Sequence, residues 1–204
     1  RGINVGRANR VAMADLRSTF EGLGCVDVRT VLNSGNVVFT SKSASPTSSA
    51  RIEKAIAARL GVSTRVTVLT AEEFAAIVAG NPLLPLASDP SRLLVAVLAD
   101  PADQVKLKPL LKRNWDQEAL AIGPRAAYLW CPSGVLASSL WAAVGNSLGD
   151  AVTSRNWTTI SKLSTRVPPR RWPTGASMRC STSRNTPSAT RYTTFAVTRT
   201  GMPS

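Results

Sequence analysis

The sequence contains no histidine among its 204 residues. This absence excludes Ser-His-Asp and Cys-His catalysis, metal sites with imidazole ligands, and general acid–base catalysis by histidine. Cysteine is scarce too: Cys25, Cys131 and Cys180 are isolated, with no C-x-x-C pair. A disulfide framework of the kind that small secreted domains use is therefore excluded, and we expect three reduced thiols. Nothing in the sequence predicts a cofactor or a metal site.

Long apolar runs are also missing. The longest, such as residues 93–99, are far shorter than the ~20 residues that a membrane-spanning helix needs. The sequence also lacks the charged start followed by an apolar stretch that is typical of a signal peptide. We therefore expect a soluble, cytoplasmic protein with no membrane partner, and its oligomeric state stays open.

Acidic residues are absent from the C-terminal fifth of the chain. Residues 1–163 hold 18 Lys and Arg and all 12 acids, a net charge of +6, whereas residues 164–204 hold seven Arg and no acid, a net charge of +7. This stretch is rich in Ser, Thr and Pro, and we predict a disordered basic tail because such a composition does not build a core. It is either a cationic arm that binds nucleic acid or extraneous sequence without a selected role, and we favour the second interpretation.

The first part of the chain alternates helix and strand patterns. Residues 1–6 read as the end of a strand that runs into a loop, and the abrupt start indicates an N-terminal truncation. Apolar residues at helical spacing predict a helix over residues 13–23. A hairpin around residues 33–36 follows, then a helix over residues 50–60 and a strand over residues 62–69. The predicted order is β-α-β-β-α-β.

The second part repeats this pattern after a connector. A capping box at Thr70–Glu73 opens a linking helix, and a loop runs on to Pro90. A strand over residues 92–98, a helix over residues 101–112 that Pro109 interrupts, and a hairpin around residues 123–125 then follow. The two last helices are predicted from apolar stripes: Leu136, Leu140, Val144 and Leu148 in one, and Trp157, Ile160 and Leu163, behind a Ser154 cap, in the other.

These patterns predict an α+β fold of two tandem ferredoxin-like β-α-β-β-α units, packed into one globular body and followed by the disordered tail. The predicted parts are a first subdomain at residues 1–70, a linking helix and loop at 71–91, a second subdomain at 92–163, and the tail at 164–204. The first strand of a ferredoxin-like unit lies centrally. If it is truncated, its neighbours have unpaired backbone groups, so we expect low stability.

Three motifs occur in a fixed order: RGINVG with MADLR within residues 1–17, NSGNVVF at residues 33–39, and TSRNW at residues 153–157. With these motifs the chain resembles the bacterial domain-of-unknown-function 1697 family from residue 1 to about residue 163. The resemblance implies a soluble, cytoplasmic α+β protein of duplicated subdomains with no established reaction. It also implies that the chain is truncated at its N-terminus and that the tail is unrelated. Two departures from the family pattern, Arg7 in place of a Gly and Ser139 in place of a Lys, weaken any shared ligand site there.

Three polar segments form a candidate anion site. The first is a Gly-rich loop flanked by arginines, the second is the turn at residues 33–36, and the third lies at a helix N-terminus, where unpaired amides attract anions. If the three meet in space, they can bind phosphate oxygens. The alternative is that these Gly and Asn residues only serve turns. The candidate residues are Arg1, Gly2, Asn4, Gly6, Arg7, Arg10, Asn33, Ser34, Gly35, Asn36, Arg155 and Asn156.

The function that this site predicts is a binding module for a phosphate-bearing ligand or nucleic acid. An RNA-binding version places aromatic side chains on an open sheet face for base stacking. The candidates for stacking are Phe39, Tyr128 and Trp130, and each is at least as well explained as a core residue.

Two alternatives come from other classes. One is an enzyme that acts on a small anionic substrate without histidine or metal, with Asp15, Asp27 or Lys162 as acid or base. Asp15 and Lys162 also suit the dipoles of their helices, so whether the protein is an enzyme stays open. The other alternative is a structural or protein-interaction module. Its groove would be lined by Trp115, Trp141 and Trp157.

Overall fold

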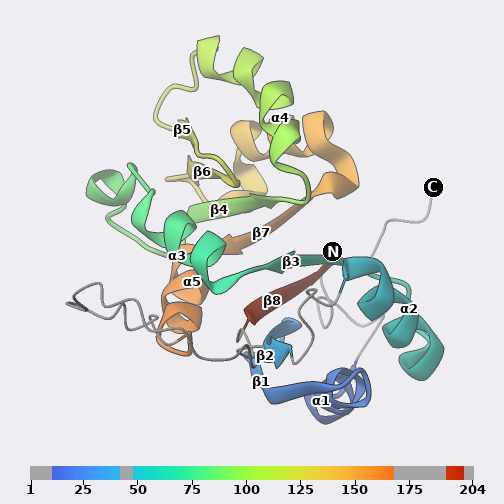
Figure 1. Ribbon diagram of the computed structural model, residues 1–204. Coiled ribbons are helices and arrows are strands. Elements are labelled where there is room, and N and C mark those ends of the chain that lie inside the picture. The colour runs from blue at the N-terminus through green and yellow to red at the C-terminus, as the bar shows by residue number, and fades with distance from the viewer. Residues whose placement is uncertain (1–10, 42–47, 168–191, 200–204) are drawn as a thin grey trace, which may run out of the picture.

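The computed structural model describes residues 11–41, 48–167 and 192–199. These residues form two four-stranded antiparallel sheets, with helices on the outer face of each and between the two (Figure 1). The predicted α+β class is confirmed. The finer assignment of each unit to the ferredoxin-like class stays a prediction, as do the predicted division points of the chain.

The first sheet has the strand order β1-β2-β8-β3. On one face it packs against the two amphipathic helices that alternate with its strands, and their buried side chains include Leu16, Phe20, Ile52 and Ile56. The rings of Phe20 and Phe39 meet there at a centroid distance of 5.0 Å. The elements are α1 (Met13–Gly22), β1 (Cys25–Val31), β2 (Asn36–Ser41), α2 (Ser49–Leu60), β3 (Arg65–Leu69) and β8 (Tyr192–Arg199).

The second sheet has the order β5-β6-β4-β7. Its outer face packs against η2 and α4 and buries a second apolar cluster that includes Leu107, Leu140 and Val144. Its elements are β4 (Leu93–Leu98), η2 (Pro101–Lys112), β5 (Ala119–Ile122), β6 (Ala126–Trp130), α4 (Ser139–Leu148) and β7 (Val152–Asn156), with short 3₁₀ turns η1 (Leu84–Leu86), η3 (Val135–Ala137) and η4 (Gly149–Ala151).

A third cluster lies between the two sheets and joins them. It includes Val38 and Leu69 of the first sheet and Val95 and Tyr128 of the second, together with side chains of α3 (Ala71–Ala79) and α5 (Trp157–Ser164). The buried Tyr128 hydroxyl donates a hydrogen bond of 2.8 Å to the carbonyl oxygen of Ile77 in α3. Both sheets therefore depend on one shared core.

Helix ends follow the local sequence. The predicted capping box of α3 is confirmed, because the Thr70 hydroxyl accepts from the Glu73 amide at 3.1 Å and the Glu73 carboxylate accepts from the Thr70 amide at 2.8 Å. Gly24, with φ of 86°, follows the end of α1, and Gly61, with φ of 65°, ends α2. A Cβ is strained in this left-handed region, which explains glycine there.

The chain after residue 100 differs from the prediction in three places within the second sheet and its helices. Residues 152–156 form the strand β7, which was not predicted, so Ser154 lies in a strand and Asn156 caps α5 instead. Leu136 lies in the turn η3 and is fully exposed, not part of the stripe of α4. Residues 101–112 form one continuous 3₁₀ helix, whose i→i+3 pattern accommodates Pro109.

The prediction of a tail without structure is wrong at residues 192–199, which form β8. Six of these eight residues, YTTFAVTR, are aromatic or β-branched, a composition that favours a strand. β8 pairs with both β2 and β3. The expected gap of unpaired backbone beside these strands is therefore filled, and that argument for low stability does not hold. The rest of the predicted tail beyond Val167 lies outside the described residues.

No helix in the described part of the chain has the length and apolarity that crossing a lipid bilayer requires.

Candidate anion-binding site

Two of the three predicted polar segments meet in the structure. The side chain of Arg155 in β7 reaches the turn between β1 and β2, where Nε donates to Oδ1 of Asn36 at 2.8 Å and Nη2 donates to the carbonyl oxygen of Ser34 at 2.9 Å. A third bond runs from Nη1 to the carbonyl oxygen of Ser154 at 2.7 Å. The guanidinium thus fixes the turn of the first sheet against the second sheet.

The Asn36 amide is buried and fully used. Its side chain donates from Nδ2 to the carbonyl oxygen of Val31 at 3.0 Å and to Oγ of Ser34 at 2.9 Å, while Oδ1 accepts from Arg155. Desolvation by burial lowers the pKa of Arg155 to about 10, so the group stays charged at neutral pH. These bonds show a structural role for both residues.

The other predicted residues of these segments also have local roles. Gly35 has φ of 77°, as its place in a tight turn requires. Asn33 is exposed on the same turn. Oδ1 of Asn156 accepts from the amide of Thr159 at 3.0 Å and from its hydroxyl at 2.8 Å, which caps α5. The residues of the first segment, the Gly-rich loop, lie outside the described residues: Arg1, Gly2, Asn4, Gly6, Arg7 and Arg10.

A hollow beside this turn concentrates positive charge. It has a volume of about 610 Å³ and lies between α1, the edge strand β1, and the end of α5. Four of its lining side chains are cationic, and its lining contains no carboxylate. We call it the cationic hollow; it is lined by Arg17, Val28, Arg29, Thr30, Val31, Leu32, Lys162, Thr165 and Arg166.

Three of the four cations have no acidic partner within the described ranges. Arg17 pairs with Glu21 at 2.8 Å, one helical turn further along α1. Arg29, Lys162 and Arg166 form no ion pair with a described residue. All three side chains are exposed and no described acid neutralises their charge, so an anion in the hollow would be attracted to them.

The rim of the hollow is strained. Leu32 has φ of 58°, a left-handed conformation that disfavours a branched side chain, and it is 42% exposed. Such conformations cost about 1–3 kcal/mol and occur often at binding sites. Leu32 directly follows β1, so this strain shapes the wall that also carries Arg29 and Thr30.

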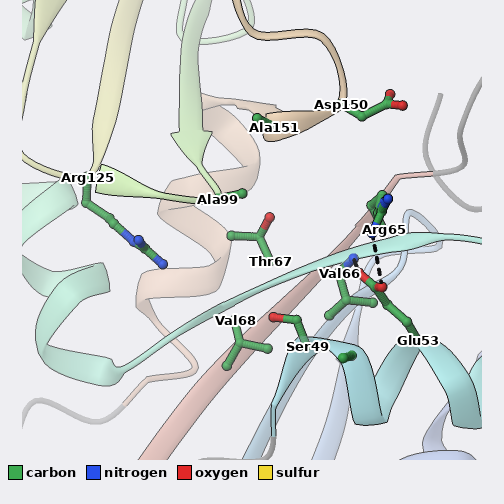
Figure 2. Close-up of a pocket in the computed structure, with 11 residues that line it drawn as sticks. Ser49, Glu53, Arg65, Val66, Thr67, Val68, Ala99, Arg125, Asp150 and Ala151 are labelled. Atoms are coloured by element: carbon green, nitrogen blue, oxygen red, sulfur yellow. Dashed lines mark hydrogen bonds and ion pairs between the residues drawn. The ribbon is translucent and has the colours of Figure 1, made fainter. Parts of the chain in front are cut away.

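A second hollow of about 450 Å³ has a different charge balance (Figure 2). It lies along the outer edge of β3, where Oε1 of Glu53 accepts from the amide of Val66 at 2.8 Å. Its two arginines have acidic partners: Arg65 pairs with Glu53 at 3.6 Å, and Arg125 pairs with Glu73 at 3.4 Å. Asp150 adds another negative charge to its lining. This hollow therefore offers no excess positive charge to an anion.

The aromatic residues do not form a stacking platform. Phe39, Tyr128 and Trp130 are 1%, 2% and 9% exposed, so they belong to the core. These side chains are therefore not available for the base stacking that the RNA-binding version of the prediction needs. The proposed groove of tryptophans is not supported either, because Trp115, Trp141 and Trp157 are half-buried and pack against two different apolar clusters.

Catalytic chemistry has little support among the described residues. They contain no group of three or more cysteine and acidic side chains that could hold a metal ion. Asp15 and Asp27 are exposed and do not line the cationic hollow, whereas Lys162 does. Burial raises the pKa of the Cys131 thiol, which makes it a poor nucleophile.

The cationic hollow could not be predicted from the sequence because its cations lie far apart in the chain. Arg17, Arg29 and Lys162 come from α1, β1 and α5, and these elements line one hollow only in the folded chain. The available signal was the basic surplus of residues 1–163, which indicates a positive surface but not its place.

Comparisons with known proteins agree with the fold. Residues 1–128 match the family model described as "Protein of unknown function (DUF1697)". No curated protein matches the chain. The solved structure of the conserved bacterial protein SP0830 from Streptococcus pneumoniae is similar to this chain, with a TM-score of 0.57 and 23% sequence identity over 82% of this chain and 95% of that one. At this identity the likeness establishes the fold alone.

Proposed function

Because the chain belongs to the DUF1697 family of proteins of unknown function, we propose its function from its own geometry: it binds a phosphate-bearing ligand in the cationic hollow. The observation that supports this proposal is the set of four cations around a hollow without a carboxylate. Phosphate groups are recognised by such sets, since Arg and Lys donate charge-assisted hydrogen bonds to their oxygens.

The residues of the hollow divide into two roles. Arg29, Lys162 and Arg166 supply the charge for phosphate oxygens, and the hydroxyl of Thr30 offers a further donor on the same wall. The Thr165 hydroxyl already donates to the carbonyl oxygen of Lys162 at 2.9 Å and holds the turn after α5. The size of the hollow suits a small ligand, because ligand pockets typically measure about 300–1,000 Å³.

The predicted site residues hold the elements that form the wall of the hollow. Arg155 and Asn36 fix the turn after β1, whose first residue, Leu32, forms part of the wall. Asn156 caps α5, which carries Lys162 near its other end. In this proposal these residues position the wall of the hollow and do not contact phosphate.

The proposal includes a cytoplasmic location. Its support is the buried free thiol of Cys131, which is typical of a reducing compartment.

The test is calorimetric titration of the full chain with inorganic pyrophosphate, ATP and a single-stranded oligonucleotide at low salt. We expect binding of at least one probe, and Arg29→Gln/Lys162→Gln should weaken it by tenfold or more. Hydrogen bonds to charged groups contribute about 1.5–3 kcal/mol each, so the loss of two makes this a lower bound. Pyrophosphate binding indicates a small-molecule site, and binding of the oligonucleotide alone indicates nucleic acid.

A matched control removes the same two charges elsewhere. Arg51 in α2 and Lys112 at the end of η2 are exposed and lie outside the lining of the hollow. Arg51→Gln/Lys112→Gln should leave affinity within about twofold, apart from a general effect of net charge that added salt removes. An equal loss in both double variants, or no binding of any probe by the unaltered chain, would refute the site.

A further inference from the structure

The central strand of the first sheet comes from the far end of the chain. β8 lies between β2 and β3 and is antiparallel to both, with Phe195 opposite Val38 on one side and opposite Leu69 on the other (Figure 1). It pairs with six residues of β2 and five of β3. Without β8, the hydrogen-bonding edges of both neighbours would be open.

In the second sheet, a different part of the chain fills the corresponding position. Its central strand, β4, also lies antiparallel between two neighbours, β6 and β7. β4 stands directly before η2 in the chain. After η2 come the hairpin of β5 and β6, the helix α4 and the strand β7. The first sheet has the same series of helix, hairpin, helix and strand, from α1 through β1, β2 and α2 to β3. Its central strand, β8, does not stand before α1 but follows α5.

The position occupied by β8 lies in buried, apolar surroundings. The β2 residues that pair with it include Val37, Val38 and Phe39, all of which are at most 5% exposed. The sheet is covered by apolar clusters on both faces. A backbone amide or carbonyl that loses its partner in such surroundings has no water to replace it, so this position strongly favours an added strand.

We infer that the space between β2 and β3 is a docking site for a β-strand, and that its occupant is the segment 192–199. The segment reaches the site through residues 168–191 and is not part of the series that builds the rest of the sheet. It therefore docks as an added strand, by main-chain hydrogen bonds, as extended peptides do when they join a sheet. A peptide of the same sequence competes for the site. This inference is independent of phosphate binding.

The position of β8 is tested in the full chain by a pair of cysteines. Thr193 stands opposite Thr40 in the register, and Thr194 stands opposite Phe39. Because successive residues of a strand lie on opposite faces, Thr40→Cys/Thr193→Cys should form a disulfide on oxidation, and the control Thr40→Cys/Thr194→Cys should not. Peptide mapping by mass spectrometry distinguishes this bond from one to Cys25. No 40–193 disulfide, or equal formation in both variants, would overturn the inference.

Exchange at the site is tested by adding a fluorescent peptide with the sequence of residues 190–201. The reduced Thr40→Cys/Thr193→Cys chain should bind the peptide, as measured by anisotropy, and the oxidised chain should bind at least tenfold less. Adding a reductant should restore binding, and a scrambled peptide should not bind. If the reduced chain does not bind the peptide, or if oxidation leaves binding unchanged, the segment is not an exchangeable occupant and the inference fails.

Discussion

At the scale of single residues, Asn36 and Arg155 show how a polar motif can have a structural purpose. Asn36 uses both amide hydrogens and its oxygen within one network, and Arg155 closes that network from the other sheet. From sequence, the same residues are typical of an anion site, because Asn, Ser, Gly and Arg serve both purposes. Only the distances tell that the guanidinium is directed at the turn.

Cys131 gives a prediction for the pH dependence of stability. Burial raises the pKa of its thiol in the folded protein, whereas in the unfolded chain the thiol titrates near ~8.5. The folded state therefore holds the proton at pH values where the unfolded state has lost it, so the contribution of Cys131 to stability decreases as pH rises above ~8.5. Urea unfolding of the unaltered chain and of Cys131→Ala between pH 7 and 10 measures this contribution. The stability difference between the two should decrease by up to ~1.4 kcal/mol per pH unit; a difference that does not change with pH would contradict the prediction.

At the scale of elements, helix ends were the most predictable features. The Thr70–Glu73 capping box is confirmed, as is the glycine after the end of α1, because these signals act within four or five residues. β7 and β8 were missed because their strand character depends on pairing with distant partners. β7 has only five residues and β8 lies in a polar, arginine-rich stretch, so neither shows a strong apolar pattern.

The candidate site was predictable in part for the same reason. The turn at residues 33–36 and the segment at Arg155 were both found, since each is a continuous motif. The cationic hollow was not found, because Arg29 is a single cation on a strand and Lys162 a single cation on a helix. No local signal tells that the end of α5 and the end of β1 will line the same hollow.

Substitutions of Asn156 can distinguish a role in capping α5 from a role in binding phosphate. Asn156→Ala removes the cap of α5, where Oδ1 accepts from Thr159, and should lower the free energy of unfolding by about 1 kcal/mol. Asn156→Asp keeps an acceptor and places a negative charge at the helix N-terminus, so its stability should stay near that of the unaltered chain. Phosphate affinity, measured by the same titration, should change less than threefold in both. A large loss of affinity without a loss of stability would place Asn156 in the ligand site instead.

At the scale of the whole molecule, the shared core makes the two sheets one body. The cluster between them contains Val38 and Leu69 from one sheet and Val95, Val97 and Tyr128 from the other. No part of this cluster can lose its packing without exposing apolar surface of the other sheet. The two halves that look separable in the sequence are therefore expected to unfold together.

Tryptophan fluorescence can check this cooperativity. Trp115, Trp130, Trp141 and Trp157 all lie in or beside the second sheet, whereas Asn36 lies in the first. Asn36→Ala should lower the free energy of unfolding by about 2–3 kcal/mol, because it removes the acceptor of Arg155 Nε and both hydrogen bonds that the buried Asn36 amide donates. Guanidinium unfolding followed by fluorescence and by far-UV circular dichroism should give coincident transitions, both shifted by this amount.

The control for this measurement is Asn33→Ala. Asn33 is exposed on the same turn, and its replacement should change stability by no more than about 0.5 kcal/mol. A fluorescence transition that does not move in Asn36→Ala would show that the second sheet unfolds on its own.

The place of β8 has a consequence for the order in which the protein folds. During synthesis on the ribosome, the residues of the second sheet emerge completely before residue 192 does, so that sheet can form first. Val38 must wait for Phe195, and contacts between such distant parts of a chain slow folding. The first sheet is thus completed last, and until β8 arrives the facing edges of β2 and β3 stay open to pairing with other chains.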